Sequence, residues 1–194
     1  EVTGKELTEV VSKMKGEEGT TVKVTVYRPS EDTYIDMVIE RRQVENPTVS
    51  HEMLEDNIGY IQIIEFDEIT AEQFNRAVDD LLEQGMTGLV VDLRDNPGGL
   101  LTSVCDILDR ILPEQLLVYT VDKEGHKVEN WAEDEDMLDI PISVLVNGNS
   151  ASASEIFAGA IQDYGAGTLV GTTTYGKGIV QSIRTLSDGS AVKL

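Results

Sequence analysis

Two short segments contain the side chains best suited to chemistry, Ser152 and Lys177. Ser152 lies in Asn147–Glu155 (NGNSASASE), where a turn rich in glycine and asparagine precedes a helical pattern. Lys177 lies between two glycines in Thr174–Gln181 (TYGKGIVQ). A serine hydroxyl becomes a nucleophile when a neighbouring base takes its proton, and lysine can be that base. The two segments therefore indicate a serine nucleophile paired with a lysine general base.

Histidine offers no alternative base in this chain. It has only two histidines, His51 and His126. His51 follows a polar linker, and His126 is expected to be solvated at the tip of a charged hairpin. Neither position suits a Ser-His-Asp arrangement. Serine chemistry here has to proceed without imidazole.

The position of Ser152 at a helix start suits acyl chemistry. A strand is expected to end near Val146, and a helix begins beside Ser152. Helix N-termini present unpaired N–H groups and the positive end of the helix dipole, which can stabilise an oxyanion. Serine is also a favoured helix cap, so Ser150, Ser152 and Ser154 fit a purely structural role equally well. This segment alone leaves both interpretations open.

Lys177 can act as a base only when its amine is neutral. That state requires a site removed from water and from carboxylates. The neighbouring residues 175–180 contain no acid. In an extended segment Lys177 and Gln181 share one face, so the Gln181 amide can orient the amine. A lysine in a surface turn is the competing interpretation.

A glycine loop completes the candidate site. Arg94–Gly99 (RDNPGG) follows the apolar strand pattern Gly88–Leu93, which suits a sheet covered on both faces. This order places the loop at the carboxyl edge of a sheet, where open α/β folds bind ligands. Glycine permits positive φ and close backbone approach, so the Gly98 and Ala153 N–H groups are candidate oxyanion donors. An ordinary strand-to-helix turn is the alternative interpretation. The loop lacks the Gly-Lys-Ser/Thr ending of a phosphate-binding loop, which argues against nucleotide binding.

Composition narrows the class of protein. The 194-residue chain can form one sizeable domain, or one domain plus a small module. Its net charge of −21 argues against nucleic-acid binding. No apolar run has the length of a membrane span. The single Cys105 fits a buried structural thiol, and the acidic run Glu133–Asp136 fits a solvated face rather than a calcium loop.

Alternating strand and helix patterns predict an α/β fold. The predicted helices cover residues 4–14, 70–83, 100–111 and 153–164. The predicted strands cover residues 21–28, 34–41, 58–66, 88–93, 117–121, 126–131, 142–146, 168–171 and 179–186. A linker is expected near Val44–Thr48, because Pro47 interrupts regular structure there.

Three segments in order resemble the carboxyl-terminal processing proteases, also called tail-specific proteases. They are Asp92–Leu101 (DLRDNPGGLL), Gly148–Asp163 (GNSASASEIFAGAIQD) and Gly176–Gln181 (GKGIVQ). The resemblance extends over about residues 58–194. It implies a Ser-Lys serine peptidase whose nucleophile, base, orienting residue and two oxyanion donors are Ser152, Lys177, Gln181, Gly98 and Ala153.

The same resemblance implies the domain organisation. Residues 45–194 would be a protease core of the crotonase and Clp-protease spiral type, truncated at its C-terminal end. Residues 1–44 would be the second half of a PDZ-like, β-rich module, with its front half missing before Glu1. The chain is therefore expected to be a fragment of a longer parent, and the missing parts leave its own activity open.

For the parent, the resemblance implies an endopeptidase that cleaves proteins near accessible C-termini through an acyl-enzyme. It implies no cofactor, no metal and no nucleic-acid partner, leaves a homodimer open, and suggests a periplasmic, membrane-anchored or secreted location. One alternative is an inert scaffold that binds C-terminal tails through the PDZ-like module. Another is crotonase-like acyl chemistry on a thioester, because backbone oxyanion holes serve both reactions.

Overall fold

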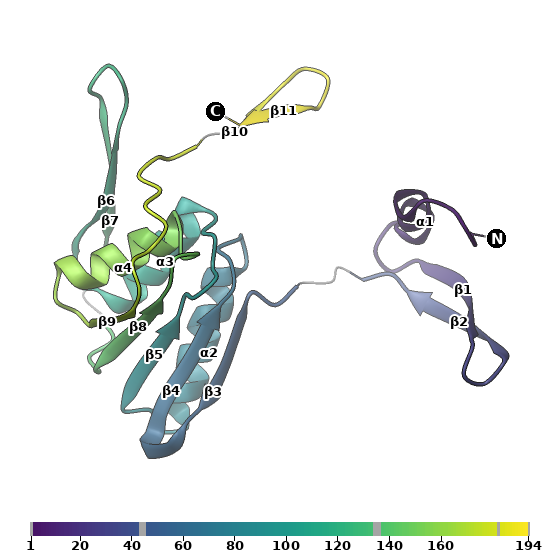
Figure 1. The fold of residues 1–194 in the computed structure, drawn as a ribbon, viewed down its shortest axis with the longest axis horizontal. Helices are drawn as coiled ribbons and strands as arrows, with labels where there is room; N and C mark the ends of the chain where they lie inside the picture. The colour runs from purple at the N-terminus through teal and green to yellow at the C-terminus, as the bar shows by residue number, and fades with distance from the viewer. Residues whose placement is uncertain (1, 43–45, 134–136, 182, 194) are drawn as a thin grey trace. The chain divides into compact units, whose positions relative to one another are not determined.

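The computed structural model describes residues 2–42, 46–133, 137–181 and 183–193. The chain divides into two compact units, Glu1–Asn46 and Pro47–Leu194 (Figure 1). The domain boundary predicted between residues 44 and 45 lies outside the described residues, as does most of the acidic run 133–136.

The first unit is one helix and one hairpin. Helix α1 spans Leu7–Met14, and strands β1 (Thr21–Arg28) and β2 (Thr33–Glu40) pair antiparallel. Arg41 joins hairpin to helix, because its Nε donates to the Met14 carbonyl oxygen at 2.8 Å. The helix and strands predicted for this region are confirmed, with ends shifted by three residues or fewer.

The second unit is built on a five-stranded sheet in the order β3-β4-β5-β8-β9. The four strands from β4 to β9 are parallel, and β3 pairs antiparallel with β4 at one edge. The strands are β3 (Val49–Met53), β4 (Ile58–Ile63), β5 (Gly88–Asp92), β8 (Ile142–Val146) and β9 (Thr168–Gly171). A short 3-10 helix, η1 (Glu55–Asn57), connects the first two.

Three helices connect the parallel strands and cover one face of the sheet. They are α2 (Thr70–Glu83), α3 (Leu101–Ile111) and α4 (Ala153–Asp163). Each crossover advances in the same direction across the sheet, and right-handed crossovers then place every helix on the same side. The contacts agree, because α3 packs against both α2 and α4 (Figure 1).

The core lies between the sheet and these helices. Strand residues that point to the helices are buried, as in β8, where burial alternates along the strand. Fully buried side chains from both layers meet there, including Ile61, Val91, Val144, Phe74 and Phe157. Burial of this apolar surface fixes the register of the strands and therefore the positions of the loops at their ends.

Two hairpins complete the unit. Strands β6 (Gln115–Val121) and β7 (Lys127–Ala132) form a long hairpin, anchored where α3 contacts β7 and α4 contacts β6. Strands β10 (Ile183–Thr185) and β11 (Ala191–Lys193) form a short one. Of the helices in the described ranges, none combines the length and the apolar run needed to traverse a lipid bilayer.

The structure corrects several sequence expectations. Val49–Met53 was not predicted as a strand, because its polar residues resemble a linker. Strand β4 ends at Ile63 instead of continuing to Phe66. The strand predicted over 179–186 begins at Ile183, and residue 182 lies outside the described residues. Helices α2, α3 and α4 cover one face of the sheet only, although four of the five residues of β5 are buried as its apolar run predicts.

Candidate active site

The candidate site forms where β5 and β8 end. These neighbouring strands are parallel, so the loop after Asp92 and the loop after Val146 leave the same edge of the sheet. The Ala151 N–H donates to the Asn96 carbonyl oxygen at 3.1 Å, and the Ser154 hydroxyl donates to the same oxygen at 3.0 Å. The glycine loop and the start of α4 are therefore hydrogen-bonded into one structure.

Asn96 is the buried centre of the glycine loop. Its side chain is fully buried, and its Nδ2 donates to the Ile63 carbonyl oxygen at 2.8 Å. Its Oδ1 accepts the Gly98 N–H, also at 2.8 Å. The Asn96 amide thus links the end of β4 to the loop after β5. Buried polar groups are normally hydrogen-bonded, and these two bonds fix the position of the loop.

The two glycines of the loop are required for different contacts. Gly98 has φ +100°, and a Cβ there would lie 2.7 Å from the Ser152 Cβ and 2.9 Å from the Ala153 nitrogen. Gly99 has φ +150°, and a Cβ would collide with the main chain of Phe66. The predicted close approach and positive φ are confirmed: residues with a side chain cannot occupy either position without strain.

The structure distinguishes Ser152 from the two serines beside it. Ser150 and Ser154 are fully buried, and their hydroxyls donate to the carbonyl oxygens of Leu93 (2.7 Å) and Asn96 (3.0 Å). Ser152 is partly exposed, precedes α4, and has φ +56° and ψ −114°. A non-glycine residue in that conformation is strained, which is typical of functional sites.

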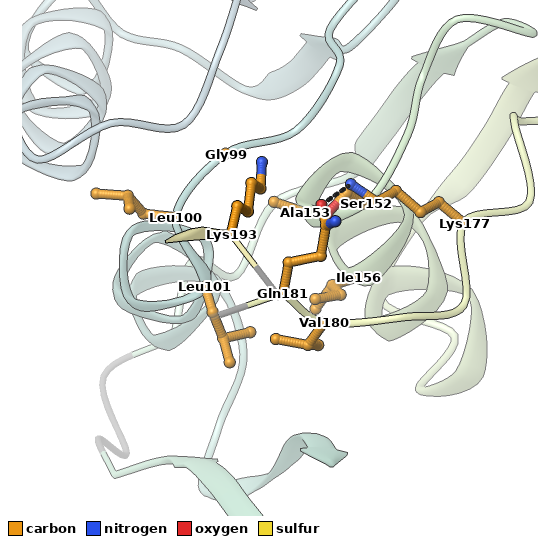
Figure 2. A pocket seen from close by; sticks show the side chains of 10 residues that line it. All are labelled: Gly99, Leu100, Leu101, Ser152, Ala153, Ile156, Lys177, Val180, Gln181 and Lys193. Carbon is orange, nitrogen blue, oxygen red and sulfur yellow. Dashed lines mark hydrogen bonds between the residues drawn. The ribbon is translucent and has the colours of Figure 1, made fainter. Parts of the chain in front are cut away.

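Ser152, Lys177 and Gln181 line the same pocket (Figure 2). The pocket is lined by Gly99, Leu100, Leu101, Ser152, Ala153, Ile156, Lys177, Val180, Gln181 and Lys193. The Lys177 Nζ donates to the Gln181 Oε1 at 3.2 Å, as the dashed line in Figure 2 marks. The contact predicted between the Gln181 amide and the Lys177 amine is therefore present.

The amine and the hydroxyl are not hydrogen-bonded to each other. Among the described residues, no hydrogen bond joins Lys177 to the Ser152 side chain, and Lys177 is half-buried. Catalytic hydrogen bonds are often long or misaligned before substrate binds, so this geometry suits a resting arrangement. No acid is among the described residues that line the pocket.

One carboxylate nevertheless lies close to the main chain of Lys177, contrary to the expectation of an acid-free surrounding. Glu155 Oε2 accepts the Lys177 N–H at 2.8 Å. Burial opposes the charge on Glu155, but hydrogen bonds from the Thr174 hydroxyl and from the N–H groups of Gly176, Lys177 and Ser152 outweigh it and lower its pKa. Glu155 is therefore ionised at neutral pH.

The two predicted oxyanion donors differ in their present partners. Among the described residues, no hydrogen bond occupies the Ala153 N–H, which begins α4 beside Ser152. The Gly98 N–H donates to Asn96. Gly99 lies next to it, lines the pocket, and donates its N–H to no acceptor in the described part of the chain. Both assignments stay predictions, and for Gly98 the bond to Asn96 would have to be shared or broken.

A second buried carboxylate stiffens the same edge of the sheet. Asp92 is fully buried and accepts hydrogen bonds from the Tyr60 hydroxyl (2.6 Å) and from Arg94 Nη2 (2.6 Å). Burial opposes the charge on Asp92, but the bonds from Arg94 and Tyr60 outweigh it and lower its pKa. This network fixes the first residues of the glycine loop from the opposite side of β5.

Neither histidine lies at the pocket. His51 contacts Asp80 of α2 through Nε2 at 2.7 Å. At the tip of the β6–β7 hairpin, ligand atoms of Asp122, Glu124 and His126 lie within 4.8 Å of one another, and all three side chains are exposed. Asp122 already accepts the N–H groups of Glu124 and His126, both at 2.9 Å, as in an ordinary turn.

Sequence reasoning missed Asn96 and Glu155 as parts of the site. A signal for Glu155 existed, because Ser152-Ala-Ser-Glu155 has the spacing of a capping box. The Glu155 carboxylate indeed accepts the Ser152 N–H at 2.9 Å. Nothing in the sequence indicated that it also reaches the loop of Lys177.

The α/β sheet and the strained Ser152 at the start of α4 suit the class of serine-type peptidases. Comparison with known families agrees, because residues 57–194 match the model of peptidase family S41. The chain belongs to that family.

Curated relatives match nearly the whole chain. It is 37% identical over 190 residues to a carboxyl-terminal-processing protease of Synechocystis sp., covering 96% of this chain and 44% of the relative. It is 39% identical over 194 residues to carboxy-terminal processing protease CtpA of Bacillus subtilis, covering 100% of this chain and 41% of the relative. The chain thus spans less than half the length of these relatives.

Solved structures share the fold. The photosystem II D1 C-terminal processing protease superposes with a TM-score of 0.67 at 30% identity, over 100% of this chain and 54% of that one. An S41 protease from Bacteroides fragilis superposes with a TM-score of 0.64 at 19% identity, over 98% and 57% of the two chains. The mixed α/β sheet is therefore the fold of S41 proteases.

Proposed function

We propose that this chain carries the catalytic core of a serine endopeptidase that cleaves proteins near their C-termini. The observation that carries the proposal is the pocket where Ser152, at a strained helix start, meets Lys177 and Gln181. The relatives named carboxyl-terminal processing proteases support the substrate class.

In the proposed reaction, Lys177 Nζ takes the proton of the Ser152 hydroxyl as Ser152 Oγ attacks the scissile carbonyl carbon. The Gln181 amide oxygen accepts a hydrogen bond from the amine and keeps it aimed at Ser152. Peptide N–H groups at the start of α4, with Ala153 first, stabilise the oxyanion together with one from the glycine loop. Lys177 returns its proton to the leaving amine, and water then hydrolyses the acyl-enzyme.

The test compares cleavage of an unstructured protein substrate by the full-length wild type, Ser152→Ala and Lys177→Ala. Each variant is expected to lose activity by several orders of magnitude, because a nucleophile and its base act as one unit and removing either stops the reaction. Lys127→Ala, on the β7 hairpin and outside the pocket, is the matched control. Wild-type rates in either pocket variant would contradict the assignment.

A fluorophosphonate probe separates this function from a tail-binding scaffold. Labelling at Ser152 requires an activated hydroxyl, so the peptidase is expected to be labelled and Lys177→Ala is not. A scaffold would bind C-terminal tails without labelling. Acyl chemistry on a thioester would give labelling together with turnover of acyl thioesters and no cleavage of proteins.

We further propose that residues 1–44 form part of a PDZ-like module that binds substrate tails. A helix followed by an antiparallel hairpin supports this assignment. Binding of C-terminal peptides with a free carboxylate, and loss of binding when that carboxylate is amidated, is the expected result.

We also propose an extracytoplasmic location for the parent, which cell fractionation checks directly.

A further inference from the structure

The loop that carries Lys177 has little structure of its own. After β9, residues 173–181 contain neither helix nor strand. Tyr175 attaches the loop to the start of α4 through one bond, from its N–H to the Ser150 carbonyl oxygen at 3.0 Å. Apart from the bond between Lys177 and Gln181 within the loop, the remaining hydrogen bonds described for residues 174–177 all lead to one side chain, Glu155.

Glu155 collects four hydrogen bonds from two segments. Its Oε1 accepts the Thr174 hydroxyl and the Gly176 N–H, each at 2.7 Å. Its Oε2 accepts the Lys177 N–H at 2.8 Å and the Ser152 N–H at 2.9 Å. The same oxygen atom therefore contacts the peptide group of the proposed nucleophile and that of the proposed base.

The chemistry of this contact requires a carboxylate. Every partner is a donor, and each carboxylate oxygen accepts two bonds. Glutamine has nearly the same shape, but it would point an NH₂ group at two of these donors. Glutamine therefore keeps the volume of Glu155 and loses half of its acceptor capacity.

We propose that Glu155 is a positioning residue that couples the Ser152 peptide to the Lys177 loop and so brings the base to the nucleophile. The inference rests on the proposed function. Glu155 does not contact substrate; it acts by holding the two main-chain segments whose side chains do.

The test introduces Glu155→Gln into the full-length protein, with Asp163→Asn as the matched control. Asp163 is an exposed acid at the other end of the same helix. Because misplacing catalytic groups by about 1 Å can cost roughly a hundredfold in rate, Glu155→Gln is expected to lower kcat about a hundredfold with KM little changed. Labelling of Ser152 by a fluorophosphonate is expected to slow by a similar factor, and Asp163→Asn to match wild type.

A second variant guards against simple unfolding. Thr174→Val keeps the shape of the side chain and removes one of the four bonds, so its kcat is expected to lie between wild type and Glu155→Gln, at an unchanged melting temperature. The proposal is overturned if Glu155→Gln keeps wild-type kcat and labelling, or if the loss in kcat only follows the loss of folded protein. Ser152→Ala is assayed alongside to tell two outcomes apart. If Ser152→Ala is active, the proposed function itself is wrong. If Ser152→Ala is inactive while Glu155→Gln is fully active, only the role of Glu155 is wrong.

Discussion

Replacing Asn96 by alanine is expected to destabilise the second unit strongly. The change removes two hydrogen bonds of 2.8 Å, one to the Ile63 carbonyl oxygen and one from the Gly98 N–H, at a site that water does not reach. A buried polar group left without its partner costs about 1–3 kcal/mol. Two such groups give an expected loss of about 2–6 kcal/mol in the free energy of unfolding.

Urea and thermal unfolding measure this loss. Trp131 is the single tryptophan of the chain and lies on β7, so its fluorescence reports on residues 47–194 alone. The melting temperature of a unit of this size falls by roughly 2–4 °C for each kcal/mol of lost stability. The fall expected for Asn96→Ala is therefore larger than the error of the measurement. Asn149→Ala is the control, because Asn149 is exposed and gives up one surface bond to Asp95.

The control is expected to stay within about 0.5 kcal/mol of wild type, as surface substitutions usually do. If Asn96→Ala unfolded with the same midpoint as Asn149→Ala, the two buried bonds would not hold the loop in place. The account of Asn96 as the link between β4 and the glycine loop would then be wrong.

Three further outcomes follow from the structure. The pKa of Asp92 is lowered from 3.8, so the stability that ionised Asp92 contributes is fully present above about pH 4 and is lost as the pH falls through the lowered pKa. The urea midpoint should therefore decline between pH 7 and pH 3, and the decline should be smaller in Asp92→Asn. Burial raises the pKa of the Cys105 thiol to about 11, so iodoacetamide at pH 7.5 should modify it far more slowly than free cysteine, as mass spectrometry can follow. Ser150→Ala and Ser154→Ala each remove a buried hydrogen bond and should lower stability by about 1 kcal/mol, while Ser152 stays reactive to a fluorophosphonate; loss of labelling without unfolding in either variant would contradict the assignment of the nucleophile.

Much of the fold could be read from local patterns. Strands β1, β8 and β9 and helix α2 were predicted with their ends correct. The pattern of apolar residues that predicts such elements is a local one, because it depends only on residues close together in the sequence. Strand β3 was missed, because an edge strand with exposed polar residues has a weak pattern and depends on pairing with β4.

The sequence by itself determined the types and order of the residues at the site: a serine before a helix, a lysine between glycines, and a glycine loop after an apolar strand. Only the tertiary structure decided that Ser150 and Ser154 are buried, that Asn96 occupies the Gly98 N–H, and that Glu155 joins the two main-chain segments. The physical reason is that periodicity is a property of consecutive residues. A hydrogen-bond partner, in contrast, depends on which distant loops the parallel crossovers bring to the same edge of the sheet.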